Sequence, residues 1–150
     1  MNEMSGSVIT GKVRMEDAYI VGPVQIGHNV VIGENTKVIG PVLIGNHVNI
    51  GDEVIIGPYS TIGNSVKIKD HSKLLSAKIF DEVEVEERTR LIGCIIDNEV
   101  EIGSECEIEN LAVIGARTKL DDRALVDSEV RIWPDLYIES DREIEEDLIE

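Results

Sequence analysis

The chain has 150 residues, with 14 basic and 30 acidic side chains, so its formal net charge is −16 at neutral pH. So acidic a balance argues against nucleic acid or an anionic membrane surface as a partner. The length suffices for one domain with a real core, and aromatic residues make up only 3% of the chain. We therefore expect a narrow core filled by aliphatic side chains.

The N-terminus is polar and the apolar runs are short, so the sequence predicts neither a signal peptide nor a membrane span. The two cysteines, Cys94 and Cys106, do not suggest a disulfide framework. We expect both to be buried, reduced thiols. These features are typical of a cytoplasmic protein.

An aliphatic residue recurs at every sixth position between residues 20 and 74, and a small or β-branched residue usually follows four positions later. A period of six fits neither a helix nor an isolated strand. Hexapeptide repeats of this kind build parallel β-helices, in which three hexapeptides close one coil and both recurring positions point inward. The aliphatic positions are Ile20, Ile26, Ile32, Val38, Ile44, Ile50, Ile56, Ile62, Ile68 and Leu74.

The repeat loses one residue twice, within residues 74–79 and within residues 91–96. A deletion inside a strand would turn core residues outward, so we expect both deletions at corners. Lys78 breaks the pattern of inward partners, whereas Ile95 is predicted to point inward. The hexapeptides of residues 20–138 predict about seven coils.

Glycine commonly follows the aliphatic position, and Asn or Asp fills many of the other corner positions. Glycine permits corners that need a positive φ, and Asn and Asp tolerate the same geometry. The sequence therefore predicts short strands joined by tight corners.

The end of the chain has features of a helix. Ser140 and Glu143 have capping-box spacing, and Ile144 and Leu148 are four residues apart. We expect a short helix at residues 141–149 that covers the open sheet edge of the last coil. A frayed acidic tail is the alternative.

These patterns divide the chain into three parts. Residues 1–7 are expected to be disordered or a linker. Residues 8–139 form the predicted all-β domain, a single-stranded parallel β-helix. Residues 140–150 form the capping helix or tail.

Four stretches carry more specific motifs, namely GPVLIGNHVNIG (40–51), IGPYSTIG (56–63), IENLAVIG (108–115) and RIWPDLYIE (131–139). Together they resemble the C-terminal left-handed β-helix of sugar-phosphate nucleotidylyltransferases. The IWP segment is most similar to the mannose-1-phosphate guanylyltransferase branch, with glucose-1-phosphate thymidylyltransferase-like proteins close behind. The resemblance implies the left-handed coil.

In that family the chemistry belongs to an N-terminal nucleotide-binding domain with a phosphate loop of the type G-x-G-T-R-L. The present sequence contains no such loop. The resemblance therefore implies a domain of nucleotide-sugar metabolism that supports oligomerisation and regulation, without nucleotidylyltransferase activity of its own. No cofactor is expected, and a separate nucleotidylyltransferase catalytic domain is a candidate partner.

An acyltransferase that uses acetyl-CoA is the alternative function. Many left-handed β-helices are trimeric acyltransferases, in which a histidine at a subunit interface acts as general base. The repeat places His28 and His47 on adjacent coils of one corner, so they are the candidate catalytic residues. The competing interpretation is a ladder of corner side chains that includes Asn46. A γ-type carbonic anhydrase needs three histidines around zinc, and the spacing of His71 from the others does not match.

A column of acidic residues is the candidate metal site. Glu34, Asp52 and Asp70 are each one coil apart, so we expect them to stack. Stacked carboxylates repel one another, and Ca²⁺ or Mg²⁺ would relieve the repulsion. A solvated acidic edge without a metal is the competing interpretation.

Outward strand positions include Val31, Leu43, Ile55 and Ile92, which a single prism would leave in water. We therefore expect a homo-oligomer, and a trimer is the form that the resemblance implies. Because each chain carries −16, association is expected to strengthen with salt.

Overall fold

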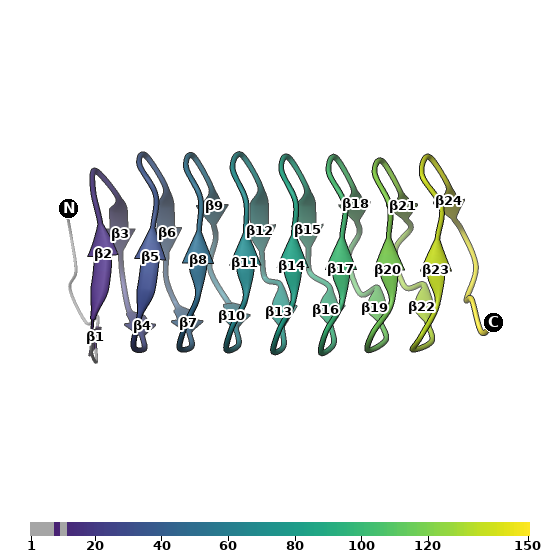
Figure 1. Cartoon of the computed structure of the whole chain (residues 1–150), viewed down its shortest axis with the longest axis horizontal. Coiled ribbons are helices and arrows are strands. Elements are labelled where there is room, and N and C mark those ends of the chain that lie inside the picture. The colour runs from purple at the N-terminus through teal and green to yellow at the C-terminus, as the bar shows by residue number, and fades with distance from the viewer. Residues whose placement is uncertain (1–7, 10–11) are drawn as a thin grey trace.

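The computed structural model describes residues 8–9 and 12–150, and the predicted linker at residues 1–7 lies outside this part of the chain. The structure is a parallel β-helix whose three sheets contain eight strands each. In Figure 1 the chain rises at the front, crosses to the back at the top and descends while it advances, which is the sense of a left-handed coil. The predicted fold class is thus confirmed. The described part of the chain holds no apolar helix of membrane-spanning length.

Each strand has two or three residues, and consecutive strands belong to different sheets. Sheet A consists of β1 (Val8–Ile9), β4 (Val24–Ile26), β7 (Val42–Ile44), β10 (Ser60–Ile62), β13 (Lys78–Ile79), β16 (Ile95–Ile96), β19 (Val113–Ile114) and β22 (Arg131–Ile132). Sheet B consists of β2 (Val13–Met15), β5 (Val30–Ile32), β8 (Asn49–Ile50), β11 (Lys67–Ile68), β14 (Glu84–Val85), β17 (Glu101–Ile102), β20 (Lys119–Leu120) and β23 (Tyr137–Ile138). Sheet C consists of β3 (Tyr19–Val21), β6 (Lys37–Ile39), β9 (Ile55–Ile56), β12 (Lys73–Leu75), β15 (Arg90–Ile92), β18 (Glu107–Ile108), β21 (Leu125–Val126) and β24 (Glu143–Ile144).

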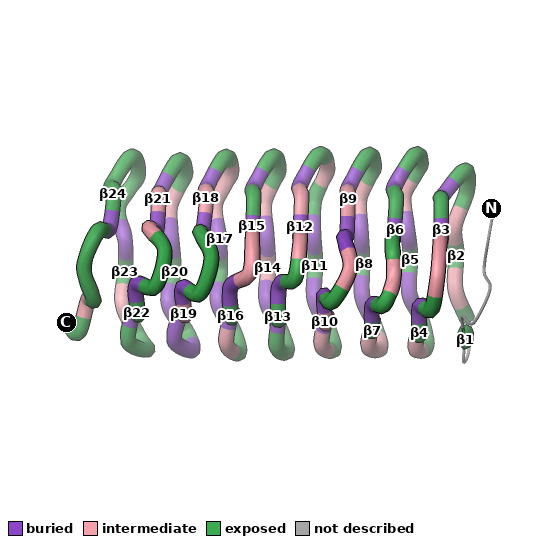
Figure 2. Tube along the Cα trace, turned by 180° about the vertical axis from the view of Figure 1, so that it is seen from behind, coloured by how far each residue is buried: buried purple, intermediate pink, exposed green. Residues whose placement is uncertain are grey.

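The register of the strands stacks the recurring aliphatic residues into one core. Ile26 pairs with Ile44, and Ile44 pairs with Ile62 in the next coil. Figure 2 shows that buried positions recur in every coil, as the hexapeptide pattern predicts. The chain adds partial coils at both ends of the regular repeat, so it makes eight turns where the sequence predicted about seven.

Both one-residue deletions fall at corners between sheets C and A, as predicted. There Ala77 and Cys94 point inward only three residues after the preceding core leucine, and both are fully buried. Lys78 consequently points outward. The prediction for Ile95 was wrong, because the shortened corner gives the inward position to Cys94 and leaves Ile95 40% exposed.

The corners use glycine differently from the prediction. Most corner residues with a positive φ are not glycine, and Asn29 and Asn35 are examples with φ of 57° and 58°. Among the described glycines, only Gly22 and Gly93 have a positive φ. A Cβ on Gly33 would instead lie 2.5 Å from the carbonyl oxygen of Gly51 in the next coil. Most glycines that follow the aliphatic position are therefore required by the close stacking of coils.

The predicted helix at residues 141–149 was wrong. The hexapeptide period continues to β24, where Ile144 is 4% exposed. The chain then continues the coil into sheet A, where Leu148 forms a parallel bridge with Ile132 of β22. Ile144 and Leu148 thus have the spacing of one helical face but belong to two extended segments.

Three exposed Arg–Asp ion pairs connect neighbouring coils at the C-terminal end of the β-helix. In each pair, an arginine donates to an aspartate that follows it by about one coil. The pairs are Arg117 Nε with Asp135 Oδ1 at 2.7 Å, Arg123 Nε with Asp141 Oδ1 at 2.6 Å, and Arg131 Nη2 with Asp147 Oδ2 at 3.0 Å. Hydrogen bonds from the arginines hold the pKa of all three aspartates below the usual value.

We expect acid to loosen the last coil before the middle coils. A carboxyl group whose pKa is lowered in the folded state stabilises that state above its unfolded pKa, near 4, and the stabilisation is lost as the pH falls through the folded pKa. Amide protection factors in residues 131–148, corrected for intrinsic exchange, should fall a few-fold below about pH 4. Arg123→Gln should produce part of this loss at neutral pH. Equal loss of protection in all coils would contradict the expectation.

Candidate functional site

His28 and His47 lie on neighbouring coils at the corner between sheets A and B, as predicted. The backbone amide of His47 donates to the carbonyl oxygen of His28 at 2.8 Å, and both residues are exposed. His71 lies at the corner between sheets B and C, where its Nδ1 is 3.3 Å from the carboxylate of Glu53. The three histidines therefore do not converge on one site, and a three-histidine zinc centre is not formed.

The same corner contains a ladder of side chains. The amide oxygen of the Asn46 side chain accepts a hydrogen bond from the backbone amide of His28 at 2.8 Å. The side-chain oxygen of Asn64 accepts one from the backbone amide of Asn46. In the next coil, the carboxylate of Asp81 accepts a hydrogen bond from the backbone amide of Asn64. A general base is usually oriented by a further group, yet of the three described histidines only His71 has an acidic partner. The corner thus has the geometry of a structural ladder.

The predicted acidic column is also stacked. Asp52 accepts a hydrogen bond from the backbone amide of Glu34 at 2.8 Å, and Asp70 accepts one from Asp52 at 2.8 Å. These hydrogen bonds join each coil to the next through a side chain and a backbone amide. The column therefore has a structural role, and its use as a cation site stays a prediction.

A second acidic group, which the sequence did not indicate, lies near the C-terminus. Carboxylate oxygens of Asp127, Glu143 and Glu145 lie within 4.8 Å of one another. Pairing of β21 with β24 brings them together. The charges of Asp127 and Glu145 raise the pKa of Glu143. All three residues are at least partly exposed to solvent.

Neither cysteine is suited to nucleophilic chemistry. Burial raises the pKa of Cys94 to about 12 and that of Cys106 to about 11. The thiolate is the reactive form, so both thiols are inert at neutral pH. Both cysteines are buried, as predicted.

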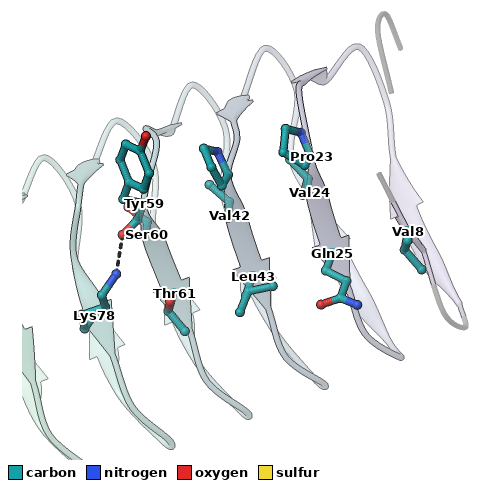
Figure 3. A pocket seen from close by; sticks show the side chains of 11 residues that line it. Val8, Pro23, Val24, Gln25, Val42, Leu43, Tyr59, Ser60, Thr61 and Lys78 are labelled. Atoms are coloured by element: carbon teal, nitrogen blue, oxygen red, sulfur yellow. Dashed lines mark hydrogen bonds between the residues drawn. The ribbon is translucent and has the colours of Figure 1, made fainter. Parts of the chain in front are cut away.

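A shallow groove of about 320 Å³ lies on the outer surface of sheet A in the first coils. Figure 3 shows the rings of Pro23 and Tyr59 along the corner, above side chains that project from the strands. At one end, Nζ of Lys78 donates to the backbone carbonyl oxygen of Tyr59 at 2.6 Å. The remaining lining residues are Val8, Val24, Gln25, Pro41, Val42, Leu43, Ser60 and Thr61.

The groove belongs to a surface whose eight strands present no acidic side chain. We call the outward residues of the sheet A strands the sheet A face. Leu43 at 49% and Ile95 at 40% are among its most exposed aliphatic residues. Its members, in register order, are Val8, Gln25, Leu43, Thr61, Lys78, Ile95, Val113 and Arg131.

The four outward aliphatic residues that the sequence singled out do not form one row. Leu43 lies on sheet A and Val31 on sheet B, whereas Ile55 and Ile92 lie on sheet C. Only Leu43 contributes to the groove. The other apolar residues of the sheet A face line up with Leu43 only after the two seventeen-residue coils are taken into account.

Comparisons with known proteins agree with this architecture. The family model of the GMPPB C-terminal domain matches residues 38–146. No curated protein matches the chain. A solved hexapeptide transferase family protein from Anaplasma phagocytophilum is 14% identical with a TM-score of 0.56, over 91% of this chain and 77% of that chain. A UDP-N-acetylglucosamine acyltransferase from Francisella novicida is 20% identical with a TM-score of 0.49, over 95% of this chain and 62% of that chain.

The three-sheet coil built from hexapeptides places the chain among the hexapeptide-repeat β-helix proteins. Within that class, the match over residues 38–146 covers most of the chain. The chain therefore belongs to the GMPPB C-terminal domain family.

Proposed function

We propose that this chain is a non-catalytic β-helix domain that supports oligomerisation and regulation of a sugar-1-phosphate nucleotidylyltransferase. The family match over residues 38–146 is the observation that carries the proposal. The domain works in the cytoplasm and uses no cofactor. A nucleotidylyltransferase catalytic domain, separate from these residues, supplies the chemistry.

The side chains support a non-catalytic role. His28 and His47 are exposed residues beside a structural ladder, and Cys94 and Cys106 have raised pKa values. The sheet A groove is open and is lined mainly by apolar and uncharged residues. A surface of this kind suits contact with another protein better than it suits acid–base chemistry.

Purified residues 1–150 should form no nucleotide sugar from a sugar 1-phosphate and a nucleoside triphosphate. The expectation follows from the missing G-x-G-T-R-L loop. Release of pyrophosphate, measured with mannose 1-phosphate and GTP, is the direct assay. A full-length mannose-1-phosphate guanylyltransferase serves as the positive control. Turnover by the purified chain would overturn the proposal.

The acyltransferase alternative is tested with the same preparation. Acetyl-CoA and amino-sugar phosphates are the substrates, and release of free CoA is the readout. We expect no turnover above background. Turnover that disappears in His28→Ala or His47→Ala would instead assign the acyltransferase function to this corner.

A further inference from the structure

We propose that the sheet A face is the surface through which two copies of this chain associate, in a two-fold contact that includes Leu43 and the adjoining groove. The inference rests on the proposed oligomerisation function and deepens it by naming the surface and the symmetry. Its basis is the uneven distribution of charge over a strongly acidic chain.

Acidic residues concentrate along one edge of the prism. The corner between sheets B and C carries acidic side chains in every coil, among them Glu16, Asp52 and Asp122. The eight strands of the sheet A face contribute none, and their charged members are the basic residues Lys78 and Arg131. Arg131 is paired with Asp147, which lies beside β22 at the end of the chain. The adjoining corner between sheets C and A is likewise free of acidic residues in its first five coils, which end at Gly93.

A second copy is the partner that this pattern favours. Two chains of −16 repel each other wherever acidic surfaces meet. Contact between two sheet A faces brings together aliphatic side chains such as Leu43 and Ile95. It keeps the most acidic corner, between sheets B and C, away from the interface. The acidic residues nearest to the contact in the middle coils lie at the corner between sheets A and B, at Asp81, Glu82, Asp97 and Glu99. A basic partner would instead be drawn to the acidic corner between sheets B and C.

The same pattern selects the symmetry. In a two-fold contact each copy presents the same surface, so sheet A meets sheet A. A three-fold contact would press sheet A against a different face of the next copy. Sheet B presents Glu84 and Glu101 there, and sheet C presents Glu107 and Glu143. The expected trimer therefore buries carboxylates that the two-fold dimer leaves in water.

The size of the face is adequate for a dimer. Eight strands about 4.8 Å apart extend over roughly 34 Å, and one side of the coil is roughly 20 Å wide. The resulting area of roughly 700 Å² is close to the ~800 Å² per partner that a stable interface buries. The groove beside Tyr59 is a concave part of this face into which side chains of a second copy can pack.

Substitutions on two faces test the proposal. Leu43→Glu and Val31→Glu change the net charge equally, and both positions are exposed, at 49% and 39%. We expect Leu43→Glu to raise the dissociation constant in sedimentation equilibrium about tenfold or more, and Val31→Glu to change it less than about threefold. Leu43→Lys, which lowers the net negative charge, should also weaken association. Circular dichroism verifies that each variant folds.

The outcomes separate this proposal from the function on which it rests. If the wild-type chain forms an oligomer of more than two copies, the sheet A dimer is wrong. It is also wrong if both Leu43 variants still associate as the wild type does. In both cases the proposed self-association is retained. An equal rise of the dissociation constant in Val31→Glu and Leu43→Glu also contradicts the sheet A dimer, because the added charge would then weaken association wherever it lies on the surface. A wild-type chain that stays monomeric overturns both proposals.

Discussion

Ile50→Asn should lower the free energy of unfolding by about 4 kcal/mol or more. Ile50 lies in β8 and is 1% exposed, with core residues of neighbouring coils on both sides along sheet B. The substitution removes aliphatic contacts and buries an amide group without a partner, so the two costs add. This loss is a large fraction of the 5–15 kcal/mol by which a typical domain is stable. Urea unfolding followed by circular dichroism measures it.

Val31→Asn is the matched control for Ile50→Asn. Val31 points outward from β5 and pairs in register with Asn49 of the next coil. The new amide group stays in water, so the cost should be less than about 1 kcal/mol. Equal losses in the two variants would show that the alternation of inward and outward residues is not as the structure has it.

Gly33→Ala should destabilise the β-helix by about 3 kcal/mol or more, at the upper end of overpacking effects. The added Cβ would lie 2.5 Å from both the carbonyl carbon and the carbonyl oxygen of Gly51. Backbone atoms cannot turn aside as the end of a flexible side chain can. Two coils must therefore separate, or the corner must change its conformation. The urea midpoint and the circular dichroism spectrum report the outcome.

Gly22→Ala distinguishes close stacking from backbone conformation. Gly22 has a φ of 75°, yet the heavy atoms nearest to a Cβ there, in the backbone of Gly40, would be 3.8 Å away. An alanine at this position bears only the cost of the left-handed conformation, about 1–2 kcal/mol. If Gly22→Ala proved more damaging than Gly33→Ala, glycine would be required for its φ and not for the stacking of coils.

The fold could be predicted from the sequence because one physical constraint repeats. Every sixth residue must fill the same narrow prism, so residues such as Ile26 and Ile44 reveal the coil directly. The repeat could not reveal how each corner is built. A corner shortened by one residue moves the inward position from Ile95 to Cys94, and the sequence offers two apolar candidates that are adjacent. At the C-terminus, Ile144 and Leu148 satisfy a helical spacing and a β-helical period at once.

The candidate site was less predictable. The repeat correctly placed His28 beside His47 and stacked Asp52 on Asp70, because both statements depend only on the length of a coil. Whether such residues bind substrate, bind metal or stack depends on what their side chains contact. The Asn and Asp oxygens accept hydrogen bonds from backbone amides of a neighbouring coil, and a repeat count does not reveal those contacts.

The sheet A groove was missed for a related reason. Its rings come from corners, at Pro23 and Tyr59, while Leu43 and Lys78 come from strands of different coils. Each of the two deletions shortens one coil from eighteen residues to seventeen. A constant period of eighteen therefore does not align Lys78 and Ile95 with the earlier coils. A signal was nevertheless present, since the outward positions of one sheet lack Asp and Glu in a chain of net charge −16.

Sedimentation equilibrium of the purified chain at low and high salt tests the central claim most directly. The claim is that this acidic β-helix serves association. Salt screens repulsion between chains that each carry −16, while burial of the sheet A face does not depend on charge. We predict a mass above that of the 16.6 kDa monomer, with a dissociation constant that falls as salt increases. A monomer at both salt concentrations would contradict the account.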